Sequence, residues 1–493
     1  MRTFLFTVTL AFGVCFLLTP RVLQLARRVG AIDVAGKEAR KVHVHDIPRL
    51  GGLAIVAGFY LPIAAVAAME TTVWRYFSED SRLAVGILFG SAIVALLGIY
   101  DDLRGARARH KLVVQLVAAG FVYALGFRVE VIDLPLLPIL DLGWLGLPLT
   151  LLWIVGVTNA VNLIDGLDGL ASGIGLFGLL PVVVLGLVYG DQFAILVGGA
   201  LVGSLLGFLV FNWHPARIFM GDTGSMFLGF VLAVMTVRTS GKGPAAVSFL
   251  TAVLALGVPI LDTLLSIVRR AWVGTPIFGA DKGHLHHRLI AMGFSHRRVV
   301  LILYSVSACF AASGLLLYWS RDARAGLILI STLLVSAALL RWLGYLRAPE
   351  GGLRLAAERR RKTVALRRRV RALDGWMKTG PGLDEIAEQA EQLAREAGAA
   401  GGRLALAPDG CERTWEWRFA GADVPSAAKS VSLALDGPTA DQGLLELRFD
   451  DPDESFESRM PALEQAAERL AAAWRQAEPN EGLPHPVSVP GSR

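Results

Sequence analysis

Two asparagines and two aspartates recur every three residues in the segment NAVNLIDGLDGLASG, residues 159–173. They are Asn159, Asn162, Asp165 and Asp168. Apolar runs flank the segment, so these side chains are expected at the edge of a membrane, where a buried carboxylate is costly. On one continuous helix they would drift through half a turn, because steps of three residues lag the 3.6-residue period. Two Asp-Gly pairs, ending at Gly166 and Gly169, allow positive φ and predict a tight loop that brings the carboxylates back over the helix end.

Amides and carboxylates gathered in this way suit a metal ion and a polar organic ligand. The simpler alternative is helix capping by Asp165 or Asp168, which stabilises a helix by about 1 kcal/mol per cap. Capping needs one such residue, and the segment holds four.

A second pair of carboxylates, Asp101 and Asp102, stands side by side at the end of an apolar run in YDDLRG. Hard cations such as Mg²⁺ take oxygen ligands and often keep one or two carboxylates together with phosphate oxygens. The pair therefore indicates a metal site at the membrane boundary. The alternative is a solvated turn in which Arg104 neutralises the carboxylates.

The segment NWHPARIFMGDTGS places Asp222 in a turn that leads into another apolar run. The free N–H groups at a helix N-terminus attract phosphate, whereas a carboxylate at the same place repels it. A Mg²⁺ ion between Asp222 and the phosphate would resolve that conflict. The alternative is ordinary N-capping by Thr223 or Ser225.

Three histidines, His284, His286 and His287, are followed by Arg288 in the basic segment GADKGHLHHRL. Imidazole and guanidinium groups both present N–H donors, so contact with a diphosphate is the favoured interpretation. His284 and His287 are expected on one helix face. A zinc site is an alternative, although no cysteine and only Asp281 lie near. A basic interfacial loop without chemistry is a third.

These loops depend on membrane helices for their position. The chain of 493 residues is 54% hydrophobic and 18% charged, against about a quarter charged in soluble domains. Its apolar residues fall in runs of about 17–25 residues, the length that crosses a bilayer as a helix. The pattern predicts a polytopic α-helical membrane protein with about 11 transmembrane helices. The expected spans are 3–25, 50–68, 83–100, 112–127, 147–163, 171–189, 193–212, 226–237, 247–268, 299–319 and 325–346.

The distribution of basic residues predicts the orientation of these spans. The first run, 3–25, has only Arg2 as a basic start and no small-residue cleavage site, so we expect a retained span rather than a signal peptide. Lys and Arg gather in the loops after the odd-numbered spans and after the last span, which indicates that these parts are cytoplasmic. All four motif loops then face the cytoplasm, as does the tail. Nucleic-acid binding is a poor interpretation, because the basic residues cluster beside apolar runs.

After about residue 350 the composition changes. The basic stretch 354–374 predicts a helix that is either held at an anionic membrane surface or a solvated linker. Apolar periodicity then predicts a small cytosolic α+β C-terminal domain, which suits a sensory or partner-binding module or a structural appendage. Its helices are expected near 383–397 and 456–477, and its strands near 403–407, 414–419, 429–435 and 443–449. The expected division is 1–346 for the transmembrane domain, 347–378 for a basic juxtamembrane helix, 379–480 for the small domain and 481–493 for a disordered tail.

Five segments carry a family resemblance. RKVHVHDIPRLGG, YDDLRG, NAVNLIDGLDGLASG, NWHPARIFMGDTGS and GADKGHLHHRL occur in the order seen in the polyprenyl-phosphate N-acetylhexosamine-1-phosphate transferases, glycosyltransferase family 4. Over about residues 1–346 the chain resembles the bacterial undecaprenyl-phosphate N-acetylglucosamine-1-phosphate transferase branch of that family.

The resemblance implies transfer of an N-acetylhexosamine 1-phosphate, with GlcNAc favoured, from a UDP-sugar to undecaprenyl or another polyprenyl phosphate. UMP is released, cell-envelope polysaccharide synthesis begins, and Mg²⁺ is required, with Mn²⁺ as a substitute. The implied catalytic residues are Asp101, Asp102, Asp165 and His287. The implied metal ligands are Asp101, Asp102 and Asp222. The implied nucleotide- and phosphate-binding residues are Lys111, Asn162, Asp168, Asn212, His284, His286 and Arg288.

The resemblance also implies a multi-pass protein of the bacterial cytoplasmic (inner) membrane, and it leaves room for a homodimer and for a cytosolic partner of the C-terminal domain. The same chemistry with another UDP-amino sugar or with UDP-MurNAc-pentapeptide stays open. Other classes fit less well. A prenyltransferase needs DxxxD spacing, a transporter needs polar residues near the bilayer midplane, and a non-catalytic scaffold has no need of every motif carboxylate.

Overall fold

The computed structural model describes most of the chain, which falls into two compact units. The described residues are 2–33, 46–69, 74–75, 81–132, 140–240, 245–273, 283–320, 323–344, 352–377, 381–397, 399–406, 413–418, 429–436, 442–449 and 456–477. The first unit comprises Met1–Ser266 and Ala280–Leu346, and the second comprises Ile267–Gly279 and Arg347–Arg493.

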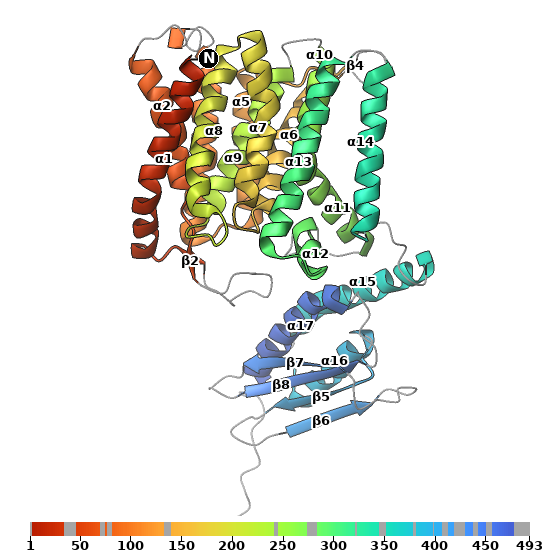
Figure 1. Ribbon diagram of the computed structural model, residues 1–493. Coiled ribbons are helices and arrows are strands. Elements are labelled where there is room, and N and C mark those ends of the chain that lie inside the picture. The colour runs from red at the N-terminus through yellow and green to blue at the C-terminus, as the bar shows by residue number, and fades with distance from the viewer. Residues whose placement is uncertain are drawn as a thin grey trace, which may run out of the picture. The chain divides into compact units, whose positions relative to one another are not determined.

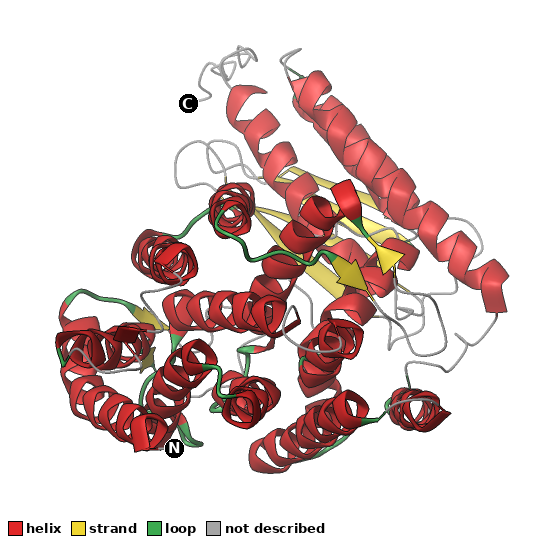
Figure 2. Ribbon diagram, turned by 90° about the horizontal axis from the view of Figure 1, so that it is seen from above, coloured by secondary structure: helices red, strands yellow, loops and turns green. Residues whose placement is uncertain are grey.

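Helices build nearly all of the described residues up to Trp342, and they lie side by side as a bundle (Figure 1). Seen from above, many of them are viewed end-on (Figure 2). The helices are α1 (Arg2–Arg28), α2 (Gly52–Ala68), α4 (Ser81–Arg104), α5 (Ala108–Ala124), α6 (Gly146–Ile164), α7 (Leu170–Tyr189), α8 (Gln192–Asn212), α9 (Gly221–Ser240), α10 (Ala245–Ala255), α11 (Gly257–Val273), α12 (Leu285–Ala291), α13 (His296–Trp319) and α14 (Ala323–Trp342).

Seven helices among the described residues are long and apolar enough to cross a membrane, as a multi-pass membrane protein requires. They are Arg2–Arg28, Ser81–Arg104, Gly143–Ile164, Leu170–Tyr189, Gln192–Asn212, His296–Trp319 and Arg324–Trp342. The other expected spans also fall on helices, but α2 and α5 have 17 residues each, and α9 carries Asp222 and Arg238. Length and composition therefore support seven crossings among the described residues, or eight if α10 and α11 form one span, and the expected count of 11 stays a prediction.

The expected span 247–268 is not a continuous helix. The chain there forms α10 and α11, which are bent by 76° at the break. Pro259, in the first turn of α11, has no N–H with which to extend the hydrogen bonding of α10. The ring of Phe310 fills the place of a side chain on Gly257, since a Cβ there would lie 2.9 Å from the ring. The pair is therefore a broken span or a re-entrant segment.

Glycines on α8 let α1 approach closely. Gly199, Gly203 and Gly207 recur every four residues, and small residues at this spacing allow membrane helices to pack backbone against backbone. A Cβ on Gly203 would collide with the carbonyl oxygen of Val8, and one on Gly207 would lie 2.7 Å from that of Phe12. The observed packing of α1 on α8 therefore requires glycine at 203 and 207.

Helix α9 is enclosed by the bundle and contacts α2, α4, α6, α7 and α10. Its residues from Thr223 to Val237 are all buried. A helix that is apolar on every side belongs in a core rather than at a surface. The shortest expected span, 226–237, thus becomes the helix around which the others pack.

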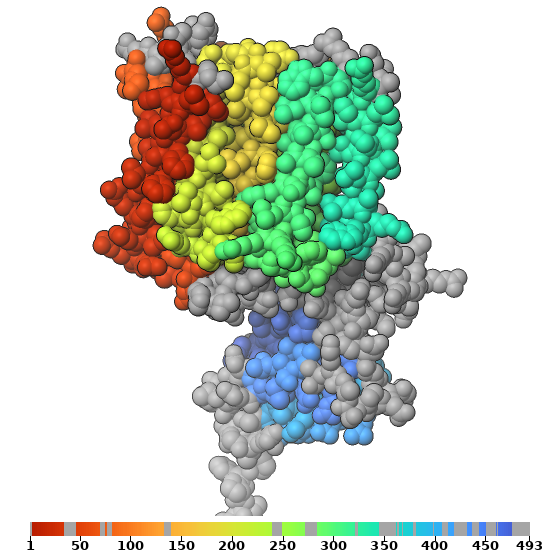
Figure 3. Space-filling model, viewed as in Figure 1, coloured from red at the N-terminus to blue at the C-terminus, as the bar shows by residue number. Residues whose placement is uncertain are grey.

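Helix α14 lies at the surface of the first unit (Figure 3). Its exposed apolar side chains include Leu327, Leu333 and Val335, each about two-thirds exposed. A continuous exposed apolar face is what a helix needs in order to face lipid.

Two short antiparallel hairpins connect helices of the first unit. β1 (Ile32–Asp33) pairs with β2 (Ile47–Pro48), and β3 (Val131–Ile132) pairs with β4 (Leu140–Asp141). A single 3₁₀ turn, η1 (Gly143–Leu145), follows β4 and leads into α6.

The second unit contains a four-stranded antiparallel sheet with the strand order β6-β5-β8-β7. Its elements are α15 (Gly352–Trp376), α16 (Leu383–Ala397), β5 (Gly401–Leu406), β6 (Arg413–Arg418), β7 (Lys429–Asp436), β8 (Gln442–Phe449) and α17 (Phe456–Ala477). The expected helices and strands match these bounds to within two residues. The expected tail 481–493 lies outside the described residues, as does Asp281. The boundaries of the four expected segments stay predictions.

The apolar side of α15 is buried within its own unit. Leu366, Val370 and Leu373 form one stripe along the helix, are at most 3% exposed, and belong to the core formed with α16, α17 and the sheet. Three arginines of the same helix are exposed, namely Arg361, Arg368 and Arg371. The expected basic helix is present, and its apolar side chains at Leu366, Val370 and Leu373 are already covered.

Candidate active site

Five of the predicted site residues meet where the ends of four helices come together. They are Asp101 and Asp102 at the end of α4, Lys111 in the first turn of α5, Asn162 in the last turn of α6 and Asp222 in the first turn of α9. Helices that span a membrane side by side bring their ends to a common surface, so residues far apart in the sequence become neighbours there.

Lys111 joins two carboxylates. Its Nζ donates to Asp101 Oδ2 at 2.7 Å and also forms a short ion pair with Asp222 Oδ2. The other oxygen of Asp101 accepts the backbone N–H of Ala106 at 2.5 Å, and the other oxygen of Asp222 accepts Asn162 Nδ2 at 3.0 Å. The three charged side chains are only 13–26% exposed, so water screens their attraction weakly. Asp101 and Asp222 thus form a cation-binding arrangement that an ammonium group occupies.

Asp102 caps the N-terminus of α9. Its Oδ1 accepts the backbone N–H of Asp222 at 2.9 Å, and its Oδ2 accepts Thr223 N at 3.0 Å and Thr223 Oγ1 at 2.6 Å. The cap therefore comes from α4, and neither Thr223 nor Ser225 caps α9 as the alternative interpretation required. Gly221 has φ +66°, and a Cβ there would lie 2.6 Å from the Asp102 carboxylate. Asp102 is 3% exposed and fixes the position of Asp222.

The segment 165–169 forms the expected tight loop between α6 and α7. Gly169 adopts φ +75°, as the sequence predicted. Gly166 is not among the glycines with positive φ, so that part of the prediction is wrong. Glycine is required at Gly166 for another reason, because a Cβ there would lie 2.6 Å from Nε2 of His286. The histidine segment therefore lies directly against this loop.

Asp165 experiences an excess of negative charge. Burial raises the pKa of its carboxyl well above the usual range, and the negative charges of Asp222, Asp102 and Asp168 raise this pKa further. A carboxyl in such surroundings favours either a proton or a cation nearby. A positive charge is therefore favoured both beside Asp222 and beside the loop 165–169.

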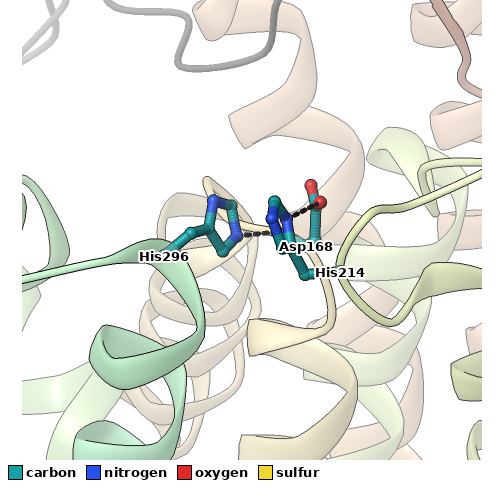
Figure 4. A group of neighbouring side chains, drawn as sticks. All are labelled: Asp168, His214 and His296. Carbon is teal, nitrogen blue, oxygen red and sulfur yellow. Dashed lines mark hydrogen bonds and ion pairs between the residues drawn. The ribbon is translucent and has the colours of Figure 1, made fainter.

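Asp168 holds a histidine pair (Figure 4). Its Oδ2 accepts the backbone N–H of Ala216 at 3.0 Å and lies 2.7 Å from His214 Nδ1. Its backbone N–H donates to His296 Nε2 at 3.0 Å, and the His214 and His296 rings stack with centroids 4.2 Å apart. The three side chains offer donor atoms within 4.8 Å of one another, a spacing that a metal ion can bridge. Because His296 Nε2 already accepts an amide hydrogen, the arrangement serves first to attach the 165–169 loop to α13.

Asn212 ties the same loop to the end of α8. Its Oδ1 accepts the backbone N–H of Gly169 at 3.1 Å, and its Nδ2 donates to the carbonyl oxygen of Ile218 at 3.0 Å. The side chain is 2% exposed. Most of its hydrogen-bonding capacity is therefore used within the protein, and its predicted contact with a nucleotide stays a prediction.

The histidine segment is arranged differently from the expectation. α12 begins at Leu285, and His284 is its N-cap in an extended conformation, so His284 and His287 do not share a helix face. The His284 and His286 rings are parallel with centroids 5.8 Å apart, and the His287 ring lies 4.3 Å from that of His286. Arg288 Nη1 donates to the carbonyl oxygen of Leu343 at 3.2 Å, so part of this guanidinium is used to hold the end of α14.

His286 is an uncharged group in this site. It is 2% exposed, and burial, followed by the charge of His287, lowers its pKa to about 3. Its Nδ1 is buried without a hydrogen-bond partner among the described residues. A buried polar atom without a partner is costly, so His286 is suited to donate to or accept from a bound ligand.

Sequence reasoning missed Asp262, His214, His296 and Gln115. Asp262 contacts His284 Nδ1 at 2.9 Å, and Gln115 accepts Asn159 Nδ2 at 2.6 Å. A signal for Asp262 was present, because it is the lone carboxylate of the apolar run 247–268, and an ionisable residue inside a membrane segment points to function. His214 and His296 lie in segments that were singled out, but their pairing depends on the fold.

The donor set fits a hard divalent cation. The side chains gathered around Lys111 and Asp165 present carboxylate and amide oxygens, which are the ligands that Mg²⁺ prefers. Asp101 and Asp222 already converge on one cation, the Lys111 ammonium. The excess negative charge at Asp165 shows that further positive charge would be favourable there.

Residues 84–240 match the model of glycosyl transferase family 4. A Bacillus subtilis (strain 168) protein named "Probable undecaprenyl-phosphate N-acetylglucosaminyl 1-phosphate transferase" is 40% identical over 302 residues, which are 61% of this chain and 81% of the relative. The chain belongs to glycosyl transferase family 4. "Decaprenyl-phosphate N-acetylglucosaminephosphotransferase" of Mycobacterium tuberculosis (strain ATCC 25618 / H37Rv) is 35% identical over 66% of this chain and 87% of its own length. "Phospho-N-acetylmuramoyl-pentapeptide-transferase" of Shouchella clausii (strain KSM-K16) is 32% identical over 63% and 96%.

The family 4 match runs from α4 to α9. It therefore contains the loop 165–169, Asn212 and the five residues gathered at the helix ends. We call these five the helix-end cluster: Asp101, Asp102, Lys111, Asn162 and Asp222. The match ends before α12. The histidine segment contacts the family 4 region through His286 against Gly166, and α13 contacts it through His296 with Asp168.

Proposed function

We propose that the protein transfers N-acetylhexosamine 1-phosphate, with GlcNAc 1-phosphate favoured, from a UDP-sugar to undecaprenyl phosphate and releases UMP. The names of the relatives support a polyprenyl phosphate acceptor and an N-acetylglucosamine donor. The observation that carries the proposal is the convergence of Asp101 and Asp222 on one cation beside the negatively charged loop at Asp165. Such a cluster can hold a diphosphate only together with positive charge.

The reaction is an exchange of phosphorus–oxygen bonds. An oxygen of the polyprenyl phosphate attacks the β-phosphorus of the UDP-sugar and forms a new P–O bond. The bond between the β-phosphorus and the bridging oxygen breaks, and UMP leaves with that oxygen. The product carries the sugar on a polyprenyl diphosphate, the first lipid-linked sugar of a cell-envelope polysaccharide.

Asp101, Asp222 and, from the resemblance, Asp102 would hold Mg²⁺, or Mn²⁺ as a substitute. When bound, such an ion supplies neutralisation of phosphate charge. Asp102 orients Asp222 through the N-terminus of α9, and Asn162 fixes the other oxygen of Asp222. Lys111 brings one further positive charge to the same place. His286 and His287 offer imidazole nitrogens to the diphosphate, next to the loop 165–169.

We further propose that the protein lies in a bacterial cytoplasmic membrane with 11 spans and with its motif loops and C-terminal unit in the cytoplasm. The basic residues beside the apolar helices support this orientation. A nucleotide sugar is a cytosolic compound, so the helix-end cluster must face that side.

UMP release by the purified protein tests the function. The protein in detergent would receive Mg²⁺, undecaprenyl phosphate and, in separate reactions, UDP-GlcNAc, another UDP-N-acetylhexosamine or UDP-MurNAc-pentapeptide. We expect UMP only when both substrates are present, with UDP-GlcNAc the preferred donor. UDP-MurNAc-pentapeptide as the preferred donor would reverse the sugar assignment, although the relative with that name is the less similar one, at 32% against 40% identity. No UMP with any donor would refute the function.

A further inference from the structure

A buried aspartate of α11 attaches the histidine segment. Asp262 is 1% exposed, in an apolar helix where an ionised carboxylate is expensive unless it is paired. Its Oδ2 lies 2.9 Å from His284 Nδ1, and its Oδ1 accepts the backbone N–H of Leu285 at 2.7 Å. Both oxygens of Asp262 therefore bind to the start of α12.

These two contacts determine the state of the His284 ring. An ionised carboxylate can only accept hydrogen bonds, so the proton of His284 lies on Nδ1. The second ring nitrogen, Nε2, has no hydrogen-bond partner among the described residues. In the imidazolium form both ring nitrogens carry a proton, so Nδ1–H is held by Asp262 and Nε2–H is left to donate to an anion. His284 is thus prepared to hold an anion through Nε2.

The same contacts connect α11 to the loop of the candidate site. The His284 ring lies parallel to that of His286, with centroids 5.8 Å apart. His286 in turn touches Gly166, which follows Asp165 in the loop 165–169. A shift of Asp262 would therefore move the imidazoles relative to the carboxylates.

We propose that Asp262 is a positioning residue that presents His284 Nε2 to a phosphate oxygen of the nucleotide sugar. The proposal rests on the proposed function, because it assumes a diphosphate substrate. It assigns Asp262 no contact with that substrate. Its effect passes through the ring of His284 and through the first backbone N–H of α12.

Two substitutions of His284 test the roles of its two ring nitrogens separately. In His284→Asn the amide nitrogen replaces Nδ1, so the bond to Asp262 is kept while Nε2 is lost. In His284→Gln the amide reaches the place of Nε2, and the bond to Asp262 is lost. We expect His284→Asn to lower kcat about 100-fold with unchanged thermal stability, and His284→Gln to retain more kcat than His284→Asn. Wild-type kcat in His284→Asn would overturn the proposal, because His284 would then only attach α12.

Asp262→Asn tests the positioning residue itself. We expect it to lower kcat 10- to 100-fold, with little further loss when it is combined with His284→Asn, because both changes act through one ring. Losses that multiply in the double variant would show that Asp262 acts by another route. Asp191→Asn is the matched control, because Asp191 caps α8 at the end opposite Asn212, and its kcat should equal that of the wild type.

Hydrogen exchange separates this proposal from the proposed function, since it needs no turnover. In the full-length protein without substrate, Asp262→Asn should accelerate amide exchange across Leu285–Ala291 at least tenfold, and Asp191→Asn should leave α12 unchanged. Unchanged exchange in Asp262→Asn would refute the anchoring of α12 whatever the enzyme's activity. If the wild-type protein releases no UMP, but Asp262→Asn still accelerates exchange in α12, the proposed function is refuted while the anchoring of α12 by Asp262 stands.

Discussion

Asp101 and Asp222 share one ammonium group, so the loss of either carboxylate changes the charge that a bound diphosphate meets. We expect Asp222→Asn and Asp101→Asn each to lower turnover about 10²–10³-fold, the loss typical of one preorganised electrostatic group. UMP release per folded enzyme in excess Mg²⁺ is the measurement. Asp141→Asn, in the exposed hairpin strand β4, is the control and should keep full activity. Near-normal activity of either site variant would remove that carboxylate from the proposed metal site.

Asp165 carries a charge that its surroundings oppose. Because its pKa is raised, the folded protein is destabilised by the ionised form, and this penalty is present above the raised pKa and disappears as the pH falls below the usual carboxyl range. We expect Asp165→Asn to raise the midpoint of thermal unfolding by about 2–4 °C at neutral pH without divalent cations. The difference should shrink as the pH is lowered and also when Mg²⁺ is added. A variant that unfolds at a lower temperature at pH 7 would contradict this account of the charge.

At the scale of helices, the close approach of α1 and α8 depends on Gly203. A Cβ there would already collide with the carbonyl oxygen of Val8, and a larger side chain would push α1 away. We expect Gly203→Ile to destabilise the protein by about 1–3 kcal/mol or more, as overpacking does, and to lower its yield in detergent. Gly156→Ile on α6 is the matched control, because nothing lies within 4 Å of a Cβ at that position. Equal thermal midpoints for the two variants would show that the α1–α8 contact contributes little.

The sequence was sufficient for most helices and for the residue types of the site, but not for the contacts between them. Apolar periodicity reflects burial directly, so the strands expected near 429–435 and 443–449 were placed within two residues, while the ends of several spans differ by three to five residues. The cap that Asp102 gives α9 joins residues 121 apart, and the Lys111–Asp222 pair joins residues 111 apart. No local pattern encodes such pairs, because they arise from the order in which helices pack. The break between α10 and α11 was missed for another reason, because a proline such as Pro259 is often tolerated inside a membrane helix.

For the whole molecule, we expect the part of the second unit after about residue 380 to be dispensable for the chemical step, because every residue of the candidate site lies in the first unit. A chain that ends near Gly380 should keep its UMP release per folded enzyme. It would also expose Leu366, Val370 and Leu373 of α15, which α16, α17 and the sheet normally cover, so it should aggregate. Replacing those three residues by glutamine should restore a monodisperse protein. A monodisperse yet inactive truncated enzyme would show that the second unit contributes to the reaction.

Orientation is the second expectation at this scale. A reporter that is active only in the periplasm, fused after Arg347, should be silent, because the basic residues after the last span are expected to stay in the cytoplasm. The same reporter placed in the segment 133–139, between β3 and β4, should be active. Strong reporter activity after Arg347 would show that the orientation is the reverse of the predicted one. The carboxylates would then lie on the side that lacks nucleotide sugars.

The buried stripe on α15 limits how this helix can adhere to a bilayer. Amphipathic helices usually adhere by inserting apolar side chains among acyl chains, but Leu366, Val370 and Leu373 are already used in the core of their own unit. Among the described side chains of α15, exposed positive charge remains at Arg361, Arg368 and Arg371. Attraction by charge alone reaches about 8 Å at physiological ionic strength and about 3 Å at 1 M salt. Any hold that the described side chains of α15 have on anionic lipid is therefore ionic, and concentrated salt should release it without unfolding the helix.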